Sequence, residues 1–572
     1  MNGTLAHRKE LCFWGWGYAS EALDKTELER VTHLAAGMGA ATKPGAVPEL
    51  GDFELAKPRV GVPEALSSIL SATPYDRITH GYGKSFADLV RMQMREMPNP
   101  PDWVAFPRCE DDVGALMDFA ENCGAALIPF GGGTSVCGGV ETDVIGDYSA
   151  VISVDLQYLN RVIEIDKTSR AALIEGGALG PELETALKPH GLTLRHFPQS
   201  FQFSTLGGWI ATRAGGHFAS NYTHIDDFVE SVRMITPKGV LESRRLPGSG
   251  AGPSPDRMMI GSEGTLGFIT RAWMRLQDRP RFRASASVTF PGMKEACDAV
   301  RAISQSGLFP SNCRLLDPME AQLNGVGDGV SSLMVLAFES ADHSLNAWID
   351  RALELAGDHG GCWDQEAVER SLLATAPARA KTGEHRKGAS GAWRNQFLRA
   401  PYYRNYLTPA GVIADTFETA ITWDKFDTFY ASVKERMNKE LREVTGADCR
   451  LSCRFTHIYP DGPAPYFTFY ALGSKNGDMA SMLARWREIK LAANEIVTSL
   501  GGTITHHHAV GRDHRPSGYD EQVPLLFRQA YAGARSILDP NGIMNPGVLI
   551  DTAARGATAG GIMSKMDSLE RK

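Results

Sequence analysis

The sequence predicts an α+β fold with a first domain of strands alternating with helices and a second domain whose antiparallel sheet is covered by helices. Strand and helix patterns alternate over residues 103–278. After residue 281, a set of strands mixed with helices occurs twice, as expected for one layered sheet. The length of 572 residues suits two or three domains. We expect an extension at 1–100, domains at 101–280 and 281–500, a C-terminal segment at 501–550 and a disordered tail at 551–572.

Hydrophobic periodicity defines the elements of the first domain. Val113, Leu116, Met117 and Ala120 recur at helical spacing, so residues 111–123 predict a helix. A second helix is expected at 181–190, where Gly191 ends it. The strands expected in this domain are the apolar runs at 125–128, 150–155, 161–165 and 171–175.

The second domain shows the same kinds of signal. Phe426, Phe429, Val433 and Met437 fall on one face of a helix expected over 425–440. The other helices are expected at 292–307, 345–356 and 479–500. The strands are expected at 285–290, 312–316, 333–340, 450–459 and 466–472.

Residues 377–404 are expected to form a loop with a strongly basic character. This segment contains seven Arg or Lys residues and one acid, Glu384, and four aromatic residues are interleaved with them. Such a segment suits a solvated face, a lid or a peripheral contact with a membrane surface.

Composition excludes several classes of protein. The net charge of −8 gives no basic field that would attract nucleic acid, so we expect no nucleic-acid partner. No apolar run approaches the roughly 18 residues of a membrane span, and no signal-peptide core follows the first ten residues. The nine cysteines are scattered without a C-x-x-C pair, which indicates reduced thiols and a cytoplasmic location.

A glycine-rich loop at residues 129–139 (PFGGGTSVCGG) directly follows the first-domain strand at 125–128. Five glycines let the backbone approach a ligand closely with its N–H groups free, which suits a pyrophosphate. The loop lacks the Lys of a P-loop, and the chain contains no G-x-G-x-x-G. These absences argue against a P-loop or Rossmann nucleotide site, while a tight surface turn is the ordinary alternative.

Two further segments, 198–216 (PQSFQFSTLGGWIATRAGG) and 260–270 (IGSEGTLGFIT), follow in order. With the glycine loop, they resemble the FAD-binding domain of the vanillyl-alcohol oxidase type of flavoprotein. The resemblance implies FAD and a PCMH-type domain of two α+β subdomains, in which the first loop holds the pyrophosphate and the others line the ribityl chain and flavin. The cofactor-binding residues it implies are Pro129, Gly131, Gly132, Gly133, Thr134, Ser135, Pro198, Ser200, Ser204, Thr205, Gly207, Gly208, Thr212, Arg213, Ala214, Glu263, Gly264, Thr265 and Ile269.

Three adjacent histidines, His506, His507 and His508, are the strongest catalytic candidates. In an extended segment His506 and His508 would share one face and His507 the other. Imidazoles transfer protons near neutral pH, so we expect acid/base work beside a cofactor and no metal. The alternatives are a metal on the H-x-H pair, with Asp513 and His514 as further ligands, or an exposed loop between glycines.

Other candidates are individually ambiguous. Arg314 lies between apolar residues of an expected strand, so it needs a partner, either an anionic substrate or an acid such as Asp317. Arg404 has the same ambiguity. Tyr466 starts an expected strand, where packing is the common role, and His196 lies just before the second segment.

The chain from about residue 14 to residue 549 also resembles the alkylglycerone-phosphate synthase family. The likeness rests on WGWGY at 14–18, FSTLGGW at 203–209, TRA at 212–214, FET at 417–419 with WD at 423–424, and the triple histidine. It implies acid/base roles for Tyr466 and for His506, His507 and His508, phosphate-binding or positioning roles for Arg314 and Arg404, and a bordering place for His196.

The implied reaction exchanges the acyl group of acyl-dihydroxyacetone phosphate for a fatty alcohol, which yields an ether lipid precursor. In that family, flavin N5 is thought to hold the dihydroxyacetone phosphate while the acid leaves and the alcohol enters, without net redox chemistry. We therefore expect a small-molecule or lipid substrate with an anionic head and, by analogy, a homodimer.

Some features depart from this family. The run IMNPG at 543–547 resembles flavin-dependent 2-hydroxyacid dehydrogenases such as D-lactate dehydrogenase, so an oxidase or dehydrogenase of a hydroxy acid or alcohol is the alternative function. A third hypothesis is a flavoprotein without turnover that acts as a binding module. No peroxisomal address is evident, which suggests a bacterial relative. Thr134 stands where some relatives carry a flavin-linking His, so we expect non-covalent FAD.

Overall fold

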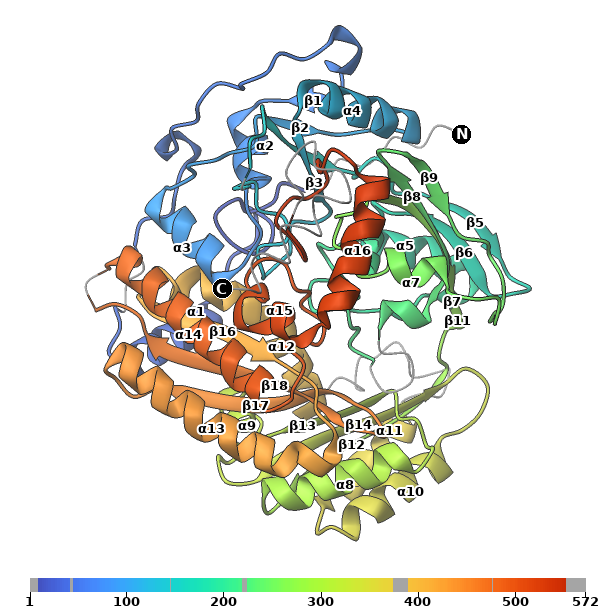
Figure 1. Ribbon diagram of the computed structural model, residues 1–572. Helices are drawn as coiled ribbons and strands as arrows, with labels where there is room; N and C mark the ends of the chain where they lie inside the picture. The colour runs from blue at the N-terminus through green and yellow to red at the C-terminus, as the bar shows by residue number, and fades with distance from the viewer. Residues whose placement is uncertain are drawn as a thin grey trace.

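The computed structural model describes residues 9–41, 45–144, 146–218, 224–373, 389–475 and 477–551. The tail expected from residue 551 therefore lies, apart from its first residue, outside the described residues, as does much of the basic segment. The described chain forms two sheets of four and five strands in an upper half, one sheet of seven strands in a lower half (Figure 1), and a further two-stranded pair. The long helix α16 (Leu525–Leu538) lies against the upper half (Figure 1).

The first sheet has four strands in the order β1-β2-β4-β3. Both β2 and β3 run parallel to β4, while β1 runs antiparallel to β2. Because β1 comes from the N-terminal extension, that extension is part of the first domain's sheet. The strands are β1 (Leu70–Ser71), β2 (Trp103–Ala105), β3 (Ala126–Phe130) and β4 (Val151–Asp155), and the helix packed beside them is α4 (Glu110–Cys123).

The second sheet is antiparallel, with five strands in the order β5-β6-β10-β8-β9. Its strands are β5 (Val162–Asp166), β6 (Ala171–Glu175), β8 (Val229–Thr236), β9 (Gly239–Glu242) and β10 (Phe268–Arg275). A short pair, β7 (Leu192–Thr193) and β11 (Gln277–Asp278), lies apart from it, and the helices of this part are α5 (Gly180–Leu187), α6 (Leu206–Thr212) and α7 (Pro255–Met259). Two α+β subdomains are therefore present, as predicted.

The lower half is built on a seven-stranded antiparallel sheet in the order β15-β12-β14-β13-β17-β18-β16. Its strands are β12 (Phe282–Phe290), β13 (Asn312–Leu316), β14 (Ser332–Ser340), β15 (Cys362–Trp363), β16 (Val412–Glu418), β17 (Arg450–Ile458) and β18 (Pro463–Leu472). Helices α8 (Met293–Gln305), α10 (Asn346–Gly357), α13 (Trp423–Thr445) and α14 (Met479–Ser499) cover the outer face of this sheet (Figure 1). The antiparallel cap sheet covered by helices is confirmed.

One large core joins this sheet to its helices. Phe426, Phe429, Val433 and Met437 of α13 are all buried in it, as the helical spacing predicted. The remaining α-helices are α1 (Lys25–Gly37), α2 (Pro74–Thr79), α3 (Phe86–Met94), α9 (Pro318–Leu323), α11 (Gln365–Leu373), α12 (Ala389–Leu407) and α15 (Asp520–Gln522).

The loop expected over 377–404 is wrong where the structure describes it, because α12 begins at Ala389 and runs through Leu407. Local composition favoured a loop, but tertiary packing decides the outcome. Tyr403 and Leu407 are buried against Val31 and Ala35 of α1. The helix therefore forms because it has a hydrophobic partner far away in the sequence.

The expected start of the strand at Tyr466 is also wrong, since β18 begins at Pro463 and Tyr466 lies inside it. Prolines in a strand usually indicate its edge, because they lack an N–H for the ladder. Here Pro465 pairs with Phe455 next to an irregularity at which β17 has one extra residue, and Pro463 pairs with Ile458 at the first position of β18. The strand therefore begins before Tyr466 despite its two prolines.

Among the described residues, no helix is both long and apolar enough to cross a membrane. The two halves face each other, and the described cavities carrying the predicted site residues lie in and around the region between them.

Candidate active site

The three glycine-rich segments predicted to bind FAD meet in space. A Cβ added to Gly132 would lie 1.7 Å from the carbonyl oxygen of Phe203 in the second segment, and one on Gly131 would lie 2.5 Å from Thr205 Oγ1. Gly264 of the third segment, with φ +75°, packs equally closely against Pro129. Only glycine permits these backbone approaches. The first loop therefore packs closely against both of the other segments.

All three segments line one narrow cavity of about 110 Å³, the glycine cavity. Its apolar wall comes from both subdomain sheets, through Val154 and Phe268 among others. An extended cofactor fits such a site, because bare backbone and small residues surround it. The predicted FAD residues that line it are Pro129, Gly131, Ser135, Thr205, Gly207, Gly208, Thr212, Glu263, Gly264 and Ile269.

Most of the other predicted FAD residues line an adjoining cavity of about 190 Å³, the central cavity. These are Gly132, Gly133, Thr134, Pro198, Ser200, Ser204 and Ala214, together with several residues of the glycine cavity. Two predicted FAD residues line neither of these cavities. Thr265 is fully buried, bonded to Tyr531 and to the Ser262 carbonyl, and Arg213 turns outward to pair with Asp226.

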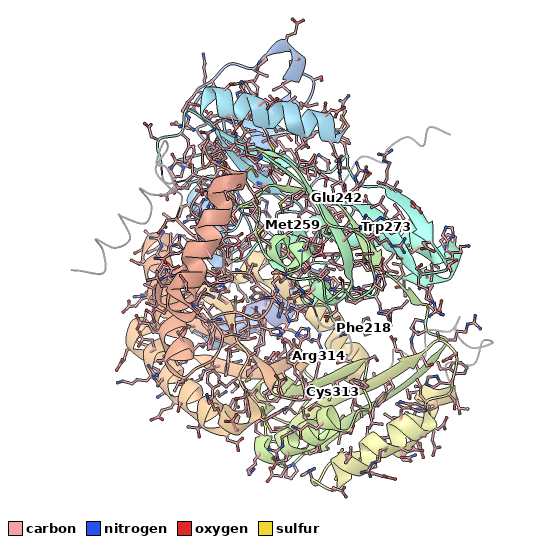
Figure 2. The ribbon with its side chains drawn as sticks, turned by 45° about the vertical axis from the view of Figure 1, so that its right-hand side comes forward. Phe218, Glu242, Met259, Trp273, Cys313 and Arg314 are labelled. Atoms are coloured by element: carbon pink, nitrogen blue, oxygen red, sulfur yellow. The ribbon has the colours of Figure 1, made fainter. Side chains whose placement is uncertain are left out.

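Cap residues form the opposite side of the central cavity. His507, His508, Tyr466 and Arg314, all predicted catalytic residues, line it together with Arg454. Figure 2 shows Arg314 and Cys313 next to each other on β13, with Phe218 of the upper half nearby. Because side chains alternate along a strand, Cys313 joins the core under the helices while Arg314 reaches the cavity.

Two buried arginines give the central cavity a positive wall. Arg314 donates from Nη2 to the His217 carbonyl, 3.1 Å away, and Arg454 pairs with Glu320 at 2.7 Å. Burial, together with the neighbouring Arg454 charge, lowers the pKa of Arg314 to about 9. Asp317, the acid proposed as an alternative partner, instead pairs with Lys434. A bound anion would offset the repulsion between the two guanidinium groups.

Glu418, at the end of β16, organises the histidine segment. One of its oxygens, Oε1, accepts the backbone N–H groups of His506, His507 and His508 at 3.1, 2.7 and 2.7 Å, and the Thr505 hydroxyl at 2.9 Å. The other oxygen, Oε2, lies 2.6 Å from His507 Nδ1. Burial acts to raise the pKa of Glu418, but His507 and His508 outweigh it and hold that pKa well below its usual value.

The extended conformation assumed for this segment is therefore wrong. Three consecutive N–H groups cannot all reach one carboxylate from a straight strand, because successive groups of a strand point to opposite sides. The segment bends around Glu418, so that His507 and His508 line the central cavity and His506 lines a different one. Burial lowers the pKa of His508 to about 3 and lowers that of His506 well below its usual value.

Tyr466 stands beside these histidines. Its hydroxyl donates to Thr416 Oγ1 at 3.1 Å, its ring lies 5.5 Å from that of His508, and the Arg454 guanidinium covers it at 4.0 Å. Burial raises the pKa of Tyr466, although the Arg454 charge opposes the shift. Tyr466 is therefore a neutral phenol, and its proton is directed to Thr416 Oγ1 beside the site.

A side cavity of about 380 Å³ adjoins the central one and shares Trp16, Arg454, Tyr466 and His508 with it. Arg404 lines this side cavity rather than the central one, and neither its Nε nor its Nη2 has a hydrogen-bond partner among the residues that the structure describes. The two predicted anion-binding arginines thus occupy neighbouring chambers. The apolar part of the wall, which comes from α1, α12 and β16, contains Val31, Leu34, Leu407 and Ala414.

His196 lies one layer behind the site. It is buried against Trp209 and Phe228, and a Cβ on Gly216, which lines the central cavity, would lie 3.1 Å from its Nδ1. Burial lowers its pKa to about 3. His196 therefore supports the backbone under the central cavity and lines neither that cavity nor the glycine or side cavity.

Within the described part of the chain, two sets of donor atoms are close enough to hold a metal ion, each set within 4.8 Å. One set is His457, His506 and His507, and the other is Glu418, His507 and His508. Neither set contains both His506 and His508, the pair that the metal alternative requires. Asp513 and His514 belong to neither set.

Sequence reasoning missed three contributors to the site. Glu418 lies within the FET run noted for its resemblance, but no local pattern assigns a role to a lone strand carboxylate. Arg454 lies on β17 in a strand pattern like that of Arg314, and the same argument would have found it. Trp16 of the N-terminal extension reaches the central cavity because Asn405 of α12 bonds its N–H and its carbonyl.

Two known families match separate parts of the chain. Residues 101–243 match the family described as "FAD binding domain", and residues 279–549 match "FAD linked oxidases, C-terminal domain". The chain is therefore an FAD-dependent enzyme.

Similar full-length proteins are known. Alkyldihydroxyacetonephosphate synthase of Dictyostelium discoideum is 31% identical over 83% of this chain and 77% of its own length. A probable mitochondrial D-lactate dehydrogenase of Danio rerio is 25% identical over 79% of this chain and 85% of its own. A solved structure of alkyldihydroxyacetonephosphate synthase superposes with a TM-score of 0.76 at 24% identity, over 95% of this chain and 99% of that one, which shows the fold.

Proposed function

The chain belongs to the alkyldihydroxyacetonephosphate synthase family, and from that premise we propose that it exchanges the acyl group of acyl-dihydroxyacetone phosphate for a fatty alcohol. The observation that carries the proposal is the central cavity. There, two buried arginines face the histidine pair that Glu418 holds. An anionic headgroup and a proton-transfer step are thereby brought to one place.

Arg314 and Arg454 would bind the phosphate of the substrate. Arginine forks match phosphate oxygens in pairs, and such charged hydrogen bonds are stronger than neutral ones. Glu320 neutralises only part of this charge, because its ion pair is with Arg454. The phosphate would anchor the three-carbon headgroup so that its first carbon lies near His507 and Tyr466.

His507 and Tyr466 would move the protons of the exchange. His507 Nδ1 lies 2.6 Å from the Glu418 carboxylate, which orients the ring and leaves Nε2 for a substrate proton. Tyr466 keeps its proton because burial raises its pKa, so it suits donation to a leaving oxygen. When bound, FAD supplies the flavin ring at which the exchange at the substrate carbon takes place.

The acyl or alkyl chain would lie in the side cavity. This cavity opens from the central one at Tyr466 and His508 and continues along the apolar residues of α1 and α12. Its volume of about 380 Å³ is within the range that small-molecule pockets commonly have. Fatty chains would therefore extend away from the phosphate site.

Mass spectrometry of products tests this function. FAD-loaded protein incubated with acyl-dihydroxyacetone phosphate and a fatty alcohol is expected to yield the ether, and Tyr466→Phe and His507→Ala are expected to lose it. Absence of the ether from FAD-loaded parent protein would contradict the proposal. It would favour hydroxy-acid oxidation, with Arg314 holding a carboxylate instead.

We also propose a homodimer, a peripheral membrane contact and a cytoplasmic location. A homodimer follows from analogy alone, and light scattering on the purified protein tests it. Peripheral membrane contact is supported by the exposed apolar residues Leu526, Phe527 and Ile537 of α16, and sedimentation with anionic vesicles tests it. A cytoplasmic location rests on the nine scattered cysteines, and cell fractionation tests it.

A further inference from the structure

A fourth cavity, of about 700 Å³, adjoins the histidine segment, and we refer to it as the outer cavity. Its wall contains Arg213 and Arg257, whose side chains are 58% and 60% exposed, so the cavity reaches solvent. His224 and His506 also line it. The function proposed above uses neither this cavity nor these two histidines.

A continuous row of hydrogen bonds joins the outer cavity to the central one. From the outer end, His224 Nε2 lies 3.1 Å from the Tyr459 hydroxyl, which lies 2.7 Å from His506 Nε2. His506 Nδ1 then lies 3.1 Å from His507 Nδ1, and His507 lines the central cavity. Four residues from three separate parts of the chain thus connect the two cavities.

One backbone carbonyl fixes the direction of this row. His224 Nδ1 is 3.1 Å from the Arg213 carbonyl, which can only accept, so Nδ1 carries the hydrogen of the neutral ring. His224 Nε2 must then accept from the Tyr459 hydroxyl. That hydroxyl oxygen in turn accepts from His506 Nε2–H, which leaves His506 Nδ1 as an acceptor. The hydrogen on His507 Nδ1 faces two acceptors, His506 Nδ1 at 3.1 Å and Glu418 Oε2 at 2.6 Å.

The environment disfavours a positive charge on His224 and on His506. Burial lowers the pKa of His224, and burial, with the neighbouring His507 as a further cause, lowers that of His506. The charged groups around the row are Glu418, at the His507 end, and Asp226, which pairs with Arg213 and Arg257. His457 packs against His506, with ring centroids 4.7 Å apart, and donates from Nε2 to the Gly216 carbonyl.

The proposed reaction needs a route for one proton. The ester C–O bond at the first carbon breaks, the alcohol oxygen bonds to that carbon, and a fatty acid leaves without any change in electron count. Because a carboxylic acid is ionised at neutral pH, each turnover releases one proton. The fatty chains would occupy the apolar side cavity, which offers that proton poor solvation.

We propose that His507, His506, Tyr459 and His224 form a proton relay from the central cavity to solvent in the outer cavity. This inference rests on the proposed function. His507 takes the substrate proton at Nε2 and passes one from Nδ1 to His506 Nδ1. His506 passes its Nε2 proton to the Tyr459 oxygen, Tyr459 passes its own to His224 Nε2, and His224 gives one to water.

The test replaces the central link of the relay. In FAD-loaded Tyr459→Phe, the phenol that joins the two imidazoles is gone, while its ring is kept. We expect kcat for ether formation to fall about tenfold or more, with an altered solvent deuterium isotope effect on kcat. KM for acyl-dihydroxyacetone phosphate and the flavin absorbance spectrum should stay unchanged, because Tyr459 does not line the central cavity.

Two further variants make the outcome decisive. His224→Asn interrupts the outer end, and combining it with Tyr459→Phe should slow kcat no more than the slower single variant, since both changes block one path. Tyr519→Phe is the matched control, because Tyr519 lines the outer cavity outside the relay and should leave kcat unchanged.

Parent-like kcat and isotope effects in Tyr459→Phe and His224→Asn would overturn the relay alone, provided that the parent makes the ether. A double variant whose kcat is lowered by the product of the two single effects would overturn the relay as well. A parent that makes no ether would overturn the proposed function and the relay with it.

Discussion

At the scale of single residues, the site depends on buried charges that are compensated across the two halves of the molecule. Glu418 is 1% exposed and is stabilised by three backbone N–H groups, a hydroxyl and two imidazoles. A buried carboxylate with so many partners holds its neighbours in place, because moving any of them leaves charge uncompensated. Glu418 therefore fixes where His507 and His508 lie.

Glu418→Gln tests this role. The amide keeps the shape but removes the charge. Its oxygen can still accept the backbone N–H groups in place of Oε1, but its NH₂ takes the place of Oε2 and cannot accept from His507 Nδ1. We expect kcat to fall about a hundredfold and the free energy of unfolding to drop by about 3 kcal/mol. Activity assays and chemical denaturation measure both, with Glu339→Gln, a carboxylate paired with Arg195 and Arg283 on the cap, as the control. Parent-like kcat in Glu418→Gln would refute the assignment.

Arg314 gives a prediction for substrate affinity. Arg314→Met removes one of two positive charges from the central cavity, so KM for the anionic substrate should rise about ten- to a hundredfold, and kcat should change less. Arg404→Met, in the side cavity, should raise KM much less. Steady-state kinetics of the two variants compare them directly. Equal effects would mean that the phosphate does not lie at Arg314.

The pH dependence of binding follows from the same residue. Burial and the Arg454 charge lower the pKa of Arg314 to about 9, so its charge is present below pH 9 and is lost as pH rises through that value. Phosphate binding needs the charged form. KM of the parent should therefore increase above pH 9, and Arg314→Met should not show that increase. Superimposable KM profiles for the two proteins would exclude Arg314 as the titrating group.

At the scale of elements, the glycine-rich loop at 129–139 and helix α4 show that both local sequence and distant packing determine which residue a position requires. Gly132 has no room for a side chain, while Gly114, inside α4, has nothing within 4 Å of an added Cβ. The first glycine is required by tertiary contact, whereas the second only weakens its helix.

This pair yields opposite expectations for one kind of substitution. Gly132→Ala should displace the second segment, abolish FAD retention on gel filtration and destabilise the fold by at least about 2 kcal/mol. Gly114→Ala should stabilise the protein by about 0.5–1 kcal/mol and leave FAD binding intact. Bound flavin per protein and thermal melting measure these effects. Full flavin content in Gly132→Ala would show that the glycine-rich loop can rearrange without losing FAD.

Periodicity predicted the elements whose local signal and tertiary packing agree, such as the strand at 171–175 and helix α13. It missed α12, because the buried partners of that helix lie on α1, more than 300 residues earlier. The histidine run was predicted as a candidate site from its composition alone. Its bent shape was not, because the carboxylate that bends it comes from β16.

At the scale of the whole molecule, the two halves and the C-terminal segment are tied together by buried polar contacts. Glu263 of the FAD-binding half accepts the N–H groups of Val510 and Gly511, which directly follow the histidine segment. Asn545 bonds the carbonyls of Gly139 and Glu263. Such contacts couple the position of the histidine segment to the FAD-binding domain.

Glu263 also makes stability depend on pH. Burial raises its pKa to about 7, and the two N–H groups only partly oppose the shift. At low pH Glu263 is neutral in both the folded and the unfolded state, so it does not change the free energy of unfolding. Ionising it requires more free energy in the folded state than in the unfolded state. The free energy of unfolding should therefore fall by about 3 kcal/mol from this group as pH rises from about 4.5 to 7.

Denaturation of the FAD-loaded parent and of Glu263→Gln at several pH values tests this slope. The parent should lose stability relative to the variant between pH 4.5 and 7, and the difference should be constant above pH 8. Parallel stability profiles would show that Glu263 is not the group responsible.

The central claim is that this FAD enzyme exchanges an acyl for an alkyl group without net redox chemistry. Counting turnovers under anaerobic conditions, with acyl-dihydroxyacetone phosphate, a fatty alcohol and no electron acceptor, tests it most directly. We predict many molecules of ether per flavin while the flavin stays oxidised between turnovers. Reaction that stops after one equivalent per flavin, with bleaching of the flavin absorbance and no ether, would contradict the claim and identify an oxidoreductase.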